Sequence, residues 1–458
     1  MEHKIAWNTY STEQRAELED FCRGYRDFLS KCKTERECVT EIIRLAEARG
    51  YRSLQSCIAA GESLRPGDKV YADCMKKSIL LFHIGQNPLE QGLAILGAHI
   101  DSPRIDVKQN PLYEDEGQAY LDTHYYGGVK KYQWVTVPLA LHGVIAKKDG
   151  SLIQVNLGEQ PDDPVLVITD LLIHLAQEQM EKNAKKVVEG EKLDVIVGSI
   201  PLADTEKEAV RANILEILKQ QYDIEEEDFL SAELEVVPAG QARDAGLDRS
   251  MILAYGHDDR VCAYTSLMAL LEQDTPEQTS CCFLCDKEEI GSVGATGARS
   301  RFLENTVAEL LACCGLNGSL ALRRCLANSR MLSSDVSPAF DPLYSSAFDK
   351  KNAGHFGRGL CFNKFTGSGG KSGANDANAE YIAELRRIMD EAGVCYHTCE
   401  LGRVDLGGGG TIAYIMALYG MQVIDSGVPL LSMHAPWELA SKADIFEAYR
   451  GYKAFLRG

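Results

Sequence analysis

The spacing of apolar and polar residues predicts that the chain begins with two helices and continues into buried strands. Apolar positions recur at helical intervals over residues 18–29, which is typical of an amphipathic helix. The capping-box pattern Thr34-Glu35-Arg36-Glu37 predicts the start of a second helix. Apolar runs over 78–84 and 93–100 then predict strands that are buried on both faces.

The pattern changes over residues 107–240. A β-rich stretch over 132–157 predicts a hairpin, and helical periodicity follows over 170–182 and 205–220. Strands and helices do not alternate regularly in this region. We therefore interpret 107–240 as an inserted domain of mixed α/β structure.

Strand and helix patterns alternate again after residue 240. A strand is predicted over 251–255, a helix over 260–271 and another strand over 280–285, and a later helix is predicted over 411–419. Such alternation is typical of an α/β layered domain. The first domain is therefore predicted to be split into residues 1–106 and 241–458, with the insert between them.

The composition, net charge and cysteine count of the chain limit which binding partners and which cellular compartment are expected for it. The chain has 458 residues, of which 45% are hydrophobic and 25% charged, as in an ordinary globular protein. No apolar run reaches the length of a membrane span. The net charge of −19 disfavours nucleic acid and anionic membranes as partners. Fifteen scattered cysteines, with no export signal at the N-terminus, predict free thiols in the cytoplasm.

The pair Glu288-Glu289 is the first candidate for chemistry. It follows the apolar run 282–285 and is itself followed by a glycine-rich segment. Adjacent carboxylates repel each other, and their desolvation is costly. A bound cation would give the pair a role, with one carboxylate as ligand and the other moving a proton. For an isolated pair, a solvated loop is the simpler interpretation.

Further metal-type side chains follow apolar runs elsewhere in the chain. Ligands collect at strand ends in α/β sheets, so these side chains are candidates to converge. Imidazole and carboxylate groups suit zinc or a related divalent ion. Spacing alone does not assign them to individual ions. The candidates are His99, Asp101, Asp258, Asp259, Asp335 and His434.

Five segments, in order, resemble the aspartyl aminopeptidase family of dinuclear zinc exopeptidases, and its bacterial members in particular. They are GAHIDSPRID, GHDDR, CDKEEIGSVGATG, SSDVSPAFDP and LLSMHAPWE, and the resemblance covers nearly the whole chain. It implies a catalytic domain with a mixed β-sheet flanked by helices, as in zinc exopeptidases. It also implies that the insert is a dimerisation domain.

The resemblance implies a ligand set for two zinc ions per subunit, with cobalt or manganese as alternatives. His99 and Asp335 would complete the site of one ion, and Glu289 and His434 that of the other. Asp258 would bridge the two ions.

The resemblance also implies roles for the neighbouring carboxylates. Glu288 would be the general base and acid, activating a metal-bridging water, and Asp101 would orient His99. Asp259 stands where related proteins often carry Asn, which favours a structural role. Whether Asp258 or Asp259 bridges the ions stays open.

Three further residues are candidates for substrate binding. His174, on a predicted helix of the insert, resembles a histidine that reaches a neighbouring subunit's active site, although packing in an interface explains it equally well. Lys371 is a candidate to hold an acidic side chain, against the alternative of a solvated loop lysine. Gly409 lies before a predicted helix, where backbone amides can hold a carbonyl, or the glycines simply permit a tight turn.

The leading hypothesis is therefore a cytoplasmic two-zinc aminopeptidase that removes the N-terminal residue of peptides, with a preference for Asp or Glu. The resemblance adds dimers that assemble into a tetrahedral dodecamer. One alternative is a dinuclear zinc amidohydrolase acting on non-peptide amides. Another is a non-catalytic, metal-stabilised assembly protein that binds peptides. The sequence contains neither H-E-x-x-H nor G-x-S-x-G, which disfavours helix-based metalloproteases and serine hydrolases.

Overall fold

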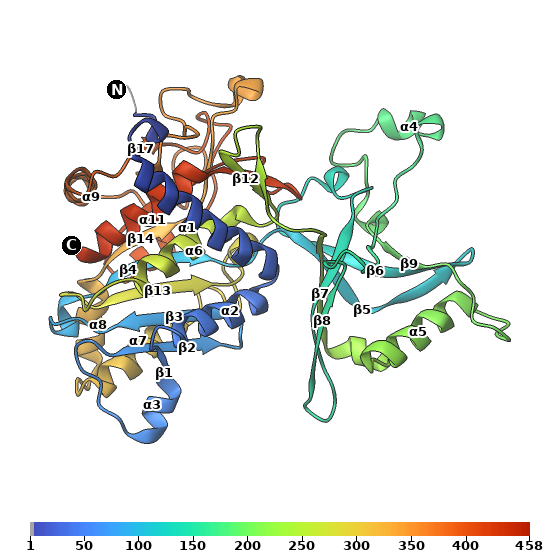
Figure 1. Ribbon diagram of the computed structural model, residues 1–458, viewed down its shortest axis with the longest axis horizontal. Helices are drawn as coiled ribbons and strands as arrows, with labels where there is room; N and C mark the ends of the chain where they lie inside the picture. The colour runs from blue at the N-terminus through green and yellow to red at the C-terminus, as the bar shows by residue number, and fades with distance from the viewer. Residues whose placement is uncertain (1–3) are drawn as a thin grey trace. The chain divides into compact units, whose positions relative to one another are not determined.

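The computed structural model describes residues 4–458, which divide into two units (Figure 1). Unit 1 comprises the chain up to Asp101 together with Ala242–Met433 and Glu438–Gly458. Unit 2 comprises Ser102–Gln241 and the short segment His434–Trp437. The main segment of unit 2 overlaps the insert predicted over 107–240.

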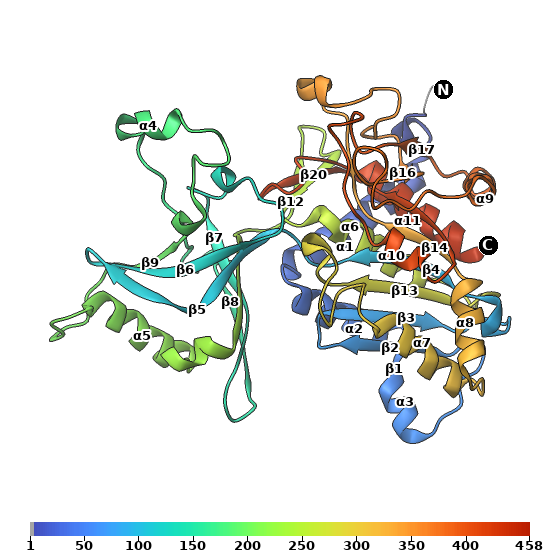
Figure 2. The same cartoon turned by 180° about the vertical axis from the view of Figure 1, so that it is seen from behind.

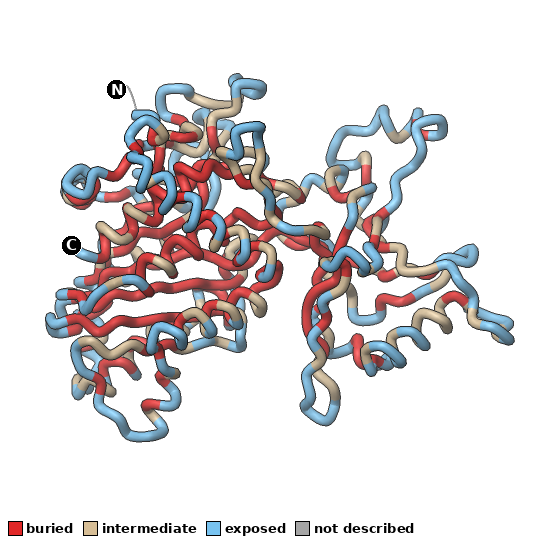
Figure 3. The backbone as a smooth tube through the Cα atoms, in the orientation of Figure 1, coloured by how far each residue is buried: buried red, intermediate tan, exposed pale blue. Residues whose placement is uncertain are grey.

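A nine-stranded mixed sheet is the centre of unit 1, with the strand order β1-β2-β3-β13-β4-β14-β18-β16-β17. The neighbours β13, β4, β14 and β18 run parallel, whereas β3 and β16 pair antiparallel with this group. Every residue of β3, β4 and β13 is buried, as expected for strands covered on both faces (Figure 3). The strands are β1 (Arg52–Ser53), β2 (Lys69–Cys74), β3 (Ser78–His83), β4 (Ala94–His99), β13 (Ser280–Cys285), β14 (Arg330–Ser334), β16 (Leu360–Asn363), β17 (Tyr396–Cys399) and β18 (Gln422–Gly427).

Helices cover both faces of this sheet (Figure 2). Because side chains alternate between the faces of a strand, Leu81 and Cys282 join one core and Leu80 and Cys281 the other. The first core contains α1 (Thr12–Lys31), α2 (Glu35–Glu47), α6 (His257–Leu271), α9 (Ala379–Glu391) and α11 (Lys442–Arg457). The second contains α3 (Leu54–Ala60), α7 (Phe302–Cys313), α8 (Ser319–Ala327) and α10 (Ala413–Ala417).

Local sequence signals explain where the first helices start. Ser11 and Gln14 form a reciprocal capping box at α1, and Thr34 and Glu37 form one at α2, as the sequence predicted for the second helix. In contrast, the helix predicted over 411–419 is shorter, because only α10 is helical there.

A smaller five-stranded sheet of unit 1 has the order β11-β12-β20-β19-β15. Its strand β12 leads directly into α6, and this junction carries Asp258 and Asp259. The strands are β11 (Arg243–Ala245), β12 (Met251–Ala254), β15 (Ser337–Pro338), β19 (Pro429–Leu431) and β20 (Glu438–Ser441).

Unit 2 contains an antiparallel six-stranded sheet with the order β8-β7-β10-β5-β6-β9. The predicted hairpin is present as β7 and β8, joined by a turn at 147–150. The strands are β5 (Arg104–Asp115), β6 (Gln118–Tyr126), β7 (Leu139–Ala146), β8 (Leu152–Leu157), β9 (Val195–Gly198) and β10 (Ala232–Pro238), and α5 spans Ala209–Tyr222.

The helix predicted over 170–182 is wrong. This segment forms only the 3-10 turn η4 (Ile173–Leu175) and the one-turn helix α4 (Gln177–Met180). Its apolar side chains at 171–173 and 175 are all exposed. A short amphipathic helix needs a packed apolar face for stability, and of the apolar residues in this segment only Ala176 is buried within residues 4–458.

No helix within residues 4–458 is long and apolar enough to cross a membrane.

Candidate metal centre

Three neighbouring parallel strands bring metal-type side chains to one edge of the unit 1 sheet. His99 ends β4, Asp335 directly follows β14, and Glu288 and Glu289 begin the 3-10 turn η7 (Glu288–Ile290) after β13. Because β13, β4 and β14 are adjacent and parallel, their carboxyl ends lie side by side.

The junction between β12 of the small sheet and α6 supplies two more carboxylates. Asp258 and Asp259 lie at the start of α6, where both have non-helical backbone angles and share a cis peptide bond. The N–H of Asp258 donates to Glu438 Oε2 at 3.0 Å, and the N–H of His99 donates to Asp259 Oδ2 at 3.3 Å. These hydrogen bonds join the two aspartates to β20 and β4.

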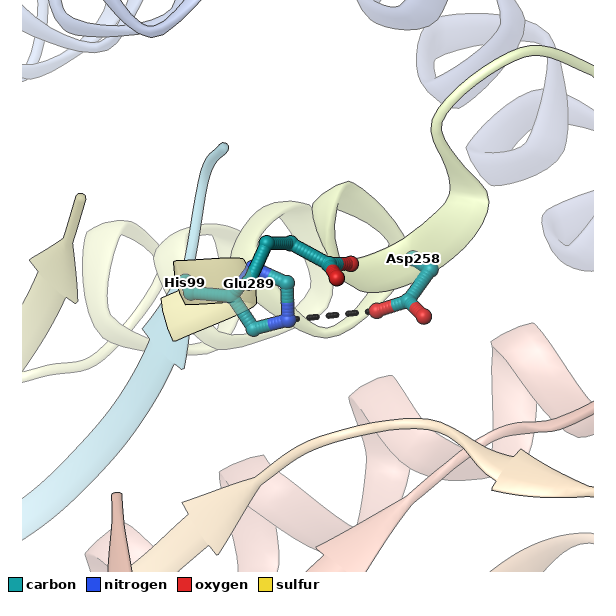
Figure 4. Close-up of side chains that lie close together, drawn as sticks. All are labelled: His99, Asp258 and Glu289. Atoms are coloured by element: carbon teal, nitrogen blue, oxygen red, sulfur yellow. Dashed lines mark ion pairs between the residues drawn. The ribbon is translucent and has the colours of Figure 1, made fainter. Parts of the chain in front are cut away.

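The donor atoms of these side chains converge. His99 Nε2 lies 3.1 Å from Asp258 Oδ1 and 3.9 Å from Asp335 Oδ1. One ligand atom from each of His99, Asp258 and Glu289 lies within 4.8 Å of the others, and Figure 4 shows their side-chain ends turned toward one another. The same limit is met by His99, Glu288 and Asp335, and by the three aspartates Asp258, Asp259 and Asp335.

The electrostatics of this cluster favour a bound cation. Burial, with the nearby carboxylate of Asp259, raises the pKa of Asp335 well above its usual value, and burial likewise raises the pKa of Asp259. Burial disfavours the charged form of His99, but the carboxylates of Asp101 and Asp258 outweigh it and raise the pKa of the imidazole. Imidazole nitrogen and several carboxylate oxygens within this range fit zinc, whose charge would relieve the repulsion.

Asp101 connects the His99 strand to the Glu288-Glu289 turn. Its two carboxylate oxygens accept the backbone N–H groups of Glu288 and Glu289, each at 3.1 Å. Its Oδ1 also lies 3.3 Å from His99 Nδ1, and its backbone oxygen lies 3.0 Å from the same nitrogen. Asp101 therefore faces the imidazole and fixes the turn at the same time.

The segment 286–297 is closed at its base by buried polar contacts. Thr296 Oγ1 donates to Asp286 Oδ2 at 2.5 Å, and the N–H of Asp286 donates to Ser78 Oγ at 3.0 Å. Burial, with the carboxyl groups of Glu35 and Asp101 nearby, raises the pKa of Asp286 to about 7. These contacts fix the position at which Glu288 and Glu289 leave β13.

His434 belongs to unit 2 rather than to the unit that contains the other expected ligands. Its backbone has a φ of 64°, and its Nδ1 lies 2.9 Å from the backbone oxygen of Gly128. Its assignment as a ligand stays a prediction.

The three candidate substrate residues lie in different surroundings. His174 is exposed on η4 in unit 2, on a 3-10 turn instead of the expected helix. Lys371 Nζ lies 3.1 Å from Asp376 Oδ2 and 3.9 Å from the centre of the Phe365 ring. Gly409 accepts the N–H of Gly367 through its backbone oxygen at 2.7 Å.

Unit 1 contains a cavity of about 390 Å³ between the loop that carries Lys371 and the loop that precedes Gly409. Lys371 and Arg403 both line this cavity. The helix that follows Gly409, α10, has only five residues. The dipole of so short a helix is small, and the carbonyl site expected at Gly409 stays a prediction.

Sequence reasoning missed Glu438 as part of the site. This buried residue accepts the N–H of Asp258 and lies four residues after His434, within the segment LLSMHAPWE. Its position at the start of an apolar strand, where an ionised side chain is costly to bury, was the available signal.

A family profile matches most of the chain, and several relatives match nearly all of it. The profile of the family Aminopeptidase I zinc metalloprotease (M18) matches residues 28–456. A probable M18 family aminopeptidase 1 of Clostridium acetobutylicum is 59% identical over 456 residues, covering 99% of this chain and 98% of the relative. The corresponding protein of Thermotoga maritima is 46% identical over 457 residues, covering 100% and 99%.

Solved structures agree with this match. The crystal structure of the Thermotoga maritima M18 aminopeptidase has a TM-score of 0.95 at 45% identity and covers 100% of this chain and 99% of its own. The crystal structure of aminopeptidase I from Clostridium acetobutylicum has a TM-score of 0.94 at 58% identity and covers 100% of both chains.

Proposed function

We propose a two-zinc mechanism for this chain, which belongs to the M18 family of zinc metalloprotease aminopeptidases. M18 is the aspartyl aminopeptidase family, so the resemblance found in the sequence is confirmed. The chain is accordingly a metalloaminopeptidase, and the predicted α/β fold with a mixed sheet flanked by helices is also confirmed.

The observation that carries the proposal is the convergence of His99, Asp258, Glu289 and Asp335 within a few ångströms. In the proposed arrangement, His99 and Asp335 hold one ion and Glu289 holds the other, with His434 as its second ligand. Asp258 would bridge the two ions, and its Oδ1 lies 3.1 Å from His99 Nε2. Zinc bound there supplies Lewis acidity, which lowers the pKa of coordinated water and polarises the scissile carbonyl.

Glu288 is the proposed general base and acid. Its carboxylate accepts a proton from the attacking water and then donates it to the departing amine. Two observations support this role. A carboxylate oxygen of Glu288 lies within 4.8 Å of donor atoms on His99 and Asp335, and the Glu288 backbone is held by Asp101. Asp101 holds both glutamates through their backbone N–H groups, which leaves each side chain to take its own role: Glu289 would hold an ion and Glu288 would move the proton.

The preference for an N-terminal Asp or Glu is the second part of the proposal. In a chain of net charge −19, an acidic side chain needs a local cation for binding. Lys371 is the proposed cation, since it borders the cavity of about 390 Å³. Because Lys371 already pairs with Asp376, an acidic substrate would share the ammonium group with that carboxylate.

Assembly through unit 2 is the third part of the proposal, with dimers forming a dodecamer and His174 acting in a neighbouring subunit's site. The apolar side chains around His174 are exposed, with Ile173 and Leu175 both 68% accessible, and such a surface is typical of an interface. A yeast relative, mApe1, forms a dodecamer and shares the fold at 20% identity, with a TM-score of 0.78. The fifteen free thiols support the proposed cytoplasmic location.

The decisive experiment measures kcat/KM for aminoacyl p-nitroanilides of Asp, Glu, Leu, Ala and Lys, each with added Zn²⁺, Co²⁺ or Mn²⁺. We expect hydrolysis with Zn²⁺ and higher kcat/KM for the acidic residues. Highest kcat/KM for Leu or Lys would contradict the acidic preference. Bound metal without hydrolysis of any N-terminal residue would favour the non-catalytic peptide-binding alternative, and activity restricted to non-peptide amides would favour the amidohydrolase. Measurement of oligomer mass by light scattering tests the assembly.

A further inference from the structure

A tyrosine of the N-terminal helix α1 contacts the histidine that precedes Asp258. Tyr25 Oη lies 2.8 Å from His257 Nδ1, and His257 Nε2 lies 3.1 Å from the backbone oxygen of Ile252. Since a carbonyl only accepts, Nε2 carries the proton and Nδ1 accepts from the tyrosine hydroxyl. Tyr25 and His257 are both 0% exposed. The ring of His257 is therefore fixed between α1 and β12, one residue before the proposed bridging ligand.

Arg260 makes a second connection to the N-terminal helices. It lies two residues after Asp258 and is 1% exposed. Its Nε donates to the backbone oxygen of Ile100 at 3.3 Å, and its Nη2 donates to the backbone oxygen of Lys33 at 2.9 Å. Ile100 stands between His99 and Asp101. One guanidinium thus joins the turn after β4, the start of α6 and the connection between α1 and α2.

The helices that receive these contacts are themselves firmly placed. At Gly24 the packing of α1 against α6 is so close that an added Cβ would lie 2.7 Å from the Tyr264 hydroxyl. The connection after α1 is held by Glu37, whose carboxylate accepts the N–H groups of Lys33 at 2.8 Å and Thr34 at 3.0 Å. The α1–α2 pair therefore offers a rigid support.

We propose that the helix pair α1–α2 is a positioning element of the metal centre, acting through Tyr25 and Arg260. The inference rests on the proposed function, because it takes His99 and Asp258 as zinc ligands. Both contacts act on the backbone that carries these ligands, so Tyr25 and Arg260 are positioning residues rather than catalytic ones. Loss of a hydrogen bond made directly to a ligand side chain costs roughly 10- to 100-fold in metal affinity or activity. Tyr25 and Arg260 act one step further out, through the backbone beside the ligands, so the expected loss lies at the lower end of that range.

The test compares Tyr25→Phe and Arg260→Lys with matched controls in the same unit. Tyr381→Phe removes a buried tyrosine hydroxyl that donates to Met331 O at 3.0 Å, and Arg330→Lys alters an arginine bound to Gln278, Glu384 and Phe455. Zinc affinity is measured by chelator competition, and kcat and KM are measured at limiting and at excess Zn²⁺.

We expect Tyr25→Phe and Arg260→Lys to bind zinc roughly 10-fold or more weakly than the unchanged protein. Their KM should be nearly unchanged, and excess Zn²⁺ should partly restore their kcat. We expect both controls to bind zinc as the unchanged protein does.

A merely structural role would lower the thermal midpoint of all four variants and leave the zinc affinity of the folded protein unchanged, which would overturn the proposal. Hydrogen exchange on the unchanged protein tests the same coupling without a substitution. Removal of zinc is expected to speed exchange of the amides over 33–38, and equal exchange with and without zinc would also overturn the proposal. Failure of the proposed function is distinguishable, because the zinc-loaded unchanged protein would then hydrolyse no aminoacyl p-nitroanilide.

Discussion

The Asp259 carboxylate accepts the backbone N–H of His99 at 3.3 Å, whereas Asp258 Oδ1 faces the imidazole of the same residue at 3.1 Å. The two adjacent aspartates therefore act on different parts of His99. Asp259 holds the backbone, and Asp258 points its oxygen at the ring. This division favours Asp258 as the bridging ligand and Asp259 as its support.

The first prediction separates these two aspartates. Asp258→Asn should lose bound zinc, because an amide oxygen carries no charge to offset that of the ions. Asp259→Asn keeps an oxygen that can accept the N–H of His99 and should retain both zinc ions, with a smaller loss of kcat. Zinc content by mass spectrometry after dialysis, measured beside kcat, checks both. Loss of zinc from Asp259→Asn alone would reverse the assignment.

The second prediction concerns the order of the glutamate pair. Glu288→Gln should keep its zinc and lower kcat by roughly 100- to 10,000-fold, since it removes only the proton-transfer group. Glu289→Gln should instead lose one zinc ion per subunit. The measurement is zinc stoichiometry together with turnover of the preferred p-nitroanilide. Near-normal turnover by Glu288→Gln would exclude it as the base.

The third prediction tests the anchor of the glutamate turn. Asp101→Asn leaves one carbonyl oxygen for two N–H groups and places an amide opposite the His99 ring, so kcat should fall roughly 10- to 100-fold. Asp106→Asn, in unit 2, serves as the control, because Asp106 pairs only with Arg104 among the contacts described for its carboxylate within residues 4–458. Unaltered kinetics in Asp101→Asn would show that the anchor is dispensable.

The fourth prediction is that the stability of the folded protein depends on pH through His83, the last residue of β3. His83 is 1% exposed, and neither ring nitrogen has a hydrogen-bond partner within residues 4–458. Burial, together with the charge of Lys69, lowers the pKa of His83 to about 4, below the value of about 6.5 for an unfolded chain. The unfolded chain therefore binds a proton first, so this stabilisation is complete above about pH 6.5 and is lost as the pH falls toward 4.

Substitution of His83 by Phe should remove this component of acid destabilisation. We expect the thermal midpoint of His83→Phe to fall less steeply between pH 6.5 and 4 than that of the unchanged protein, and to equal or exceed it at pH 5. Calorimetry across this range checks the slope, with His124→Gln, at an exposed histidine, as the control. Parallel profiles for the unchanged protein and His83→Phe would contradict the prediction.

Much of unit 1 could be predicted from sequence because its strands are apolar on both faces. The runs over 78–84, 93–100 and 280–285 correspond to β3, β4 and β13, and the metal-type residues follow from their positions at strand ends. The ends of parallel neighbours lie together, so the sequence made His99 and the Glu288-Glu289 pair candidates to converge, and the parallel pairing of β4 with β13, which brings them to one edge, is known from the structure.

The rest depends on contacts that a linear pattern does not contain. The helical periodicity over 170–182 is present in the sequence, but of its apolar residues only Ala176 is buried within residues 4–458, and only short turns form. The hydrogen bond from Arg260 to the backbone oxygen of Lys33 joins residues far apart in the chain, and the sequence around either residue does not predict it. Polar tertiary contacts of this kind become visible only after the fold is known.

The pairing of β4 with β13 has a consequence for synthesis on the ribosome. Ala94 of β4 lies opposite Ser280 of β13, so the ribosome adds 186 residues (280 − 94) after Ala94 by the time Ser280 is made. At about 5–20 residues per second, β4 waits roughly 10–40 s for β13. Both edges of β4 stay unpaired throughout that time, because its other neighbour, β14, is translated later still. The nascent polypeptide is therefore most exposed to aggregation while the insert is being made, and chaperones that shield unpaired strand edges would matter most in that interval.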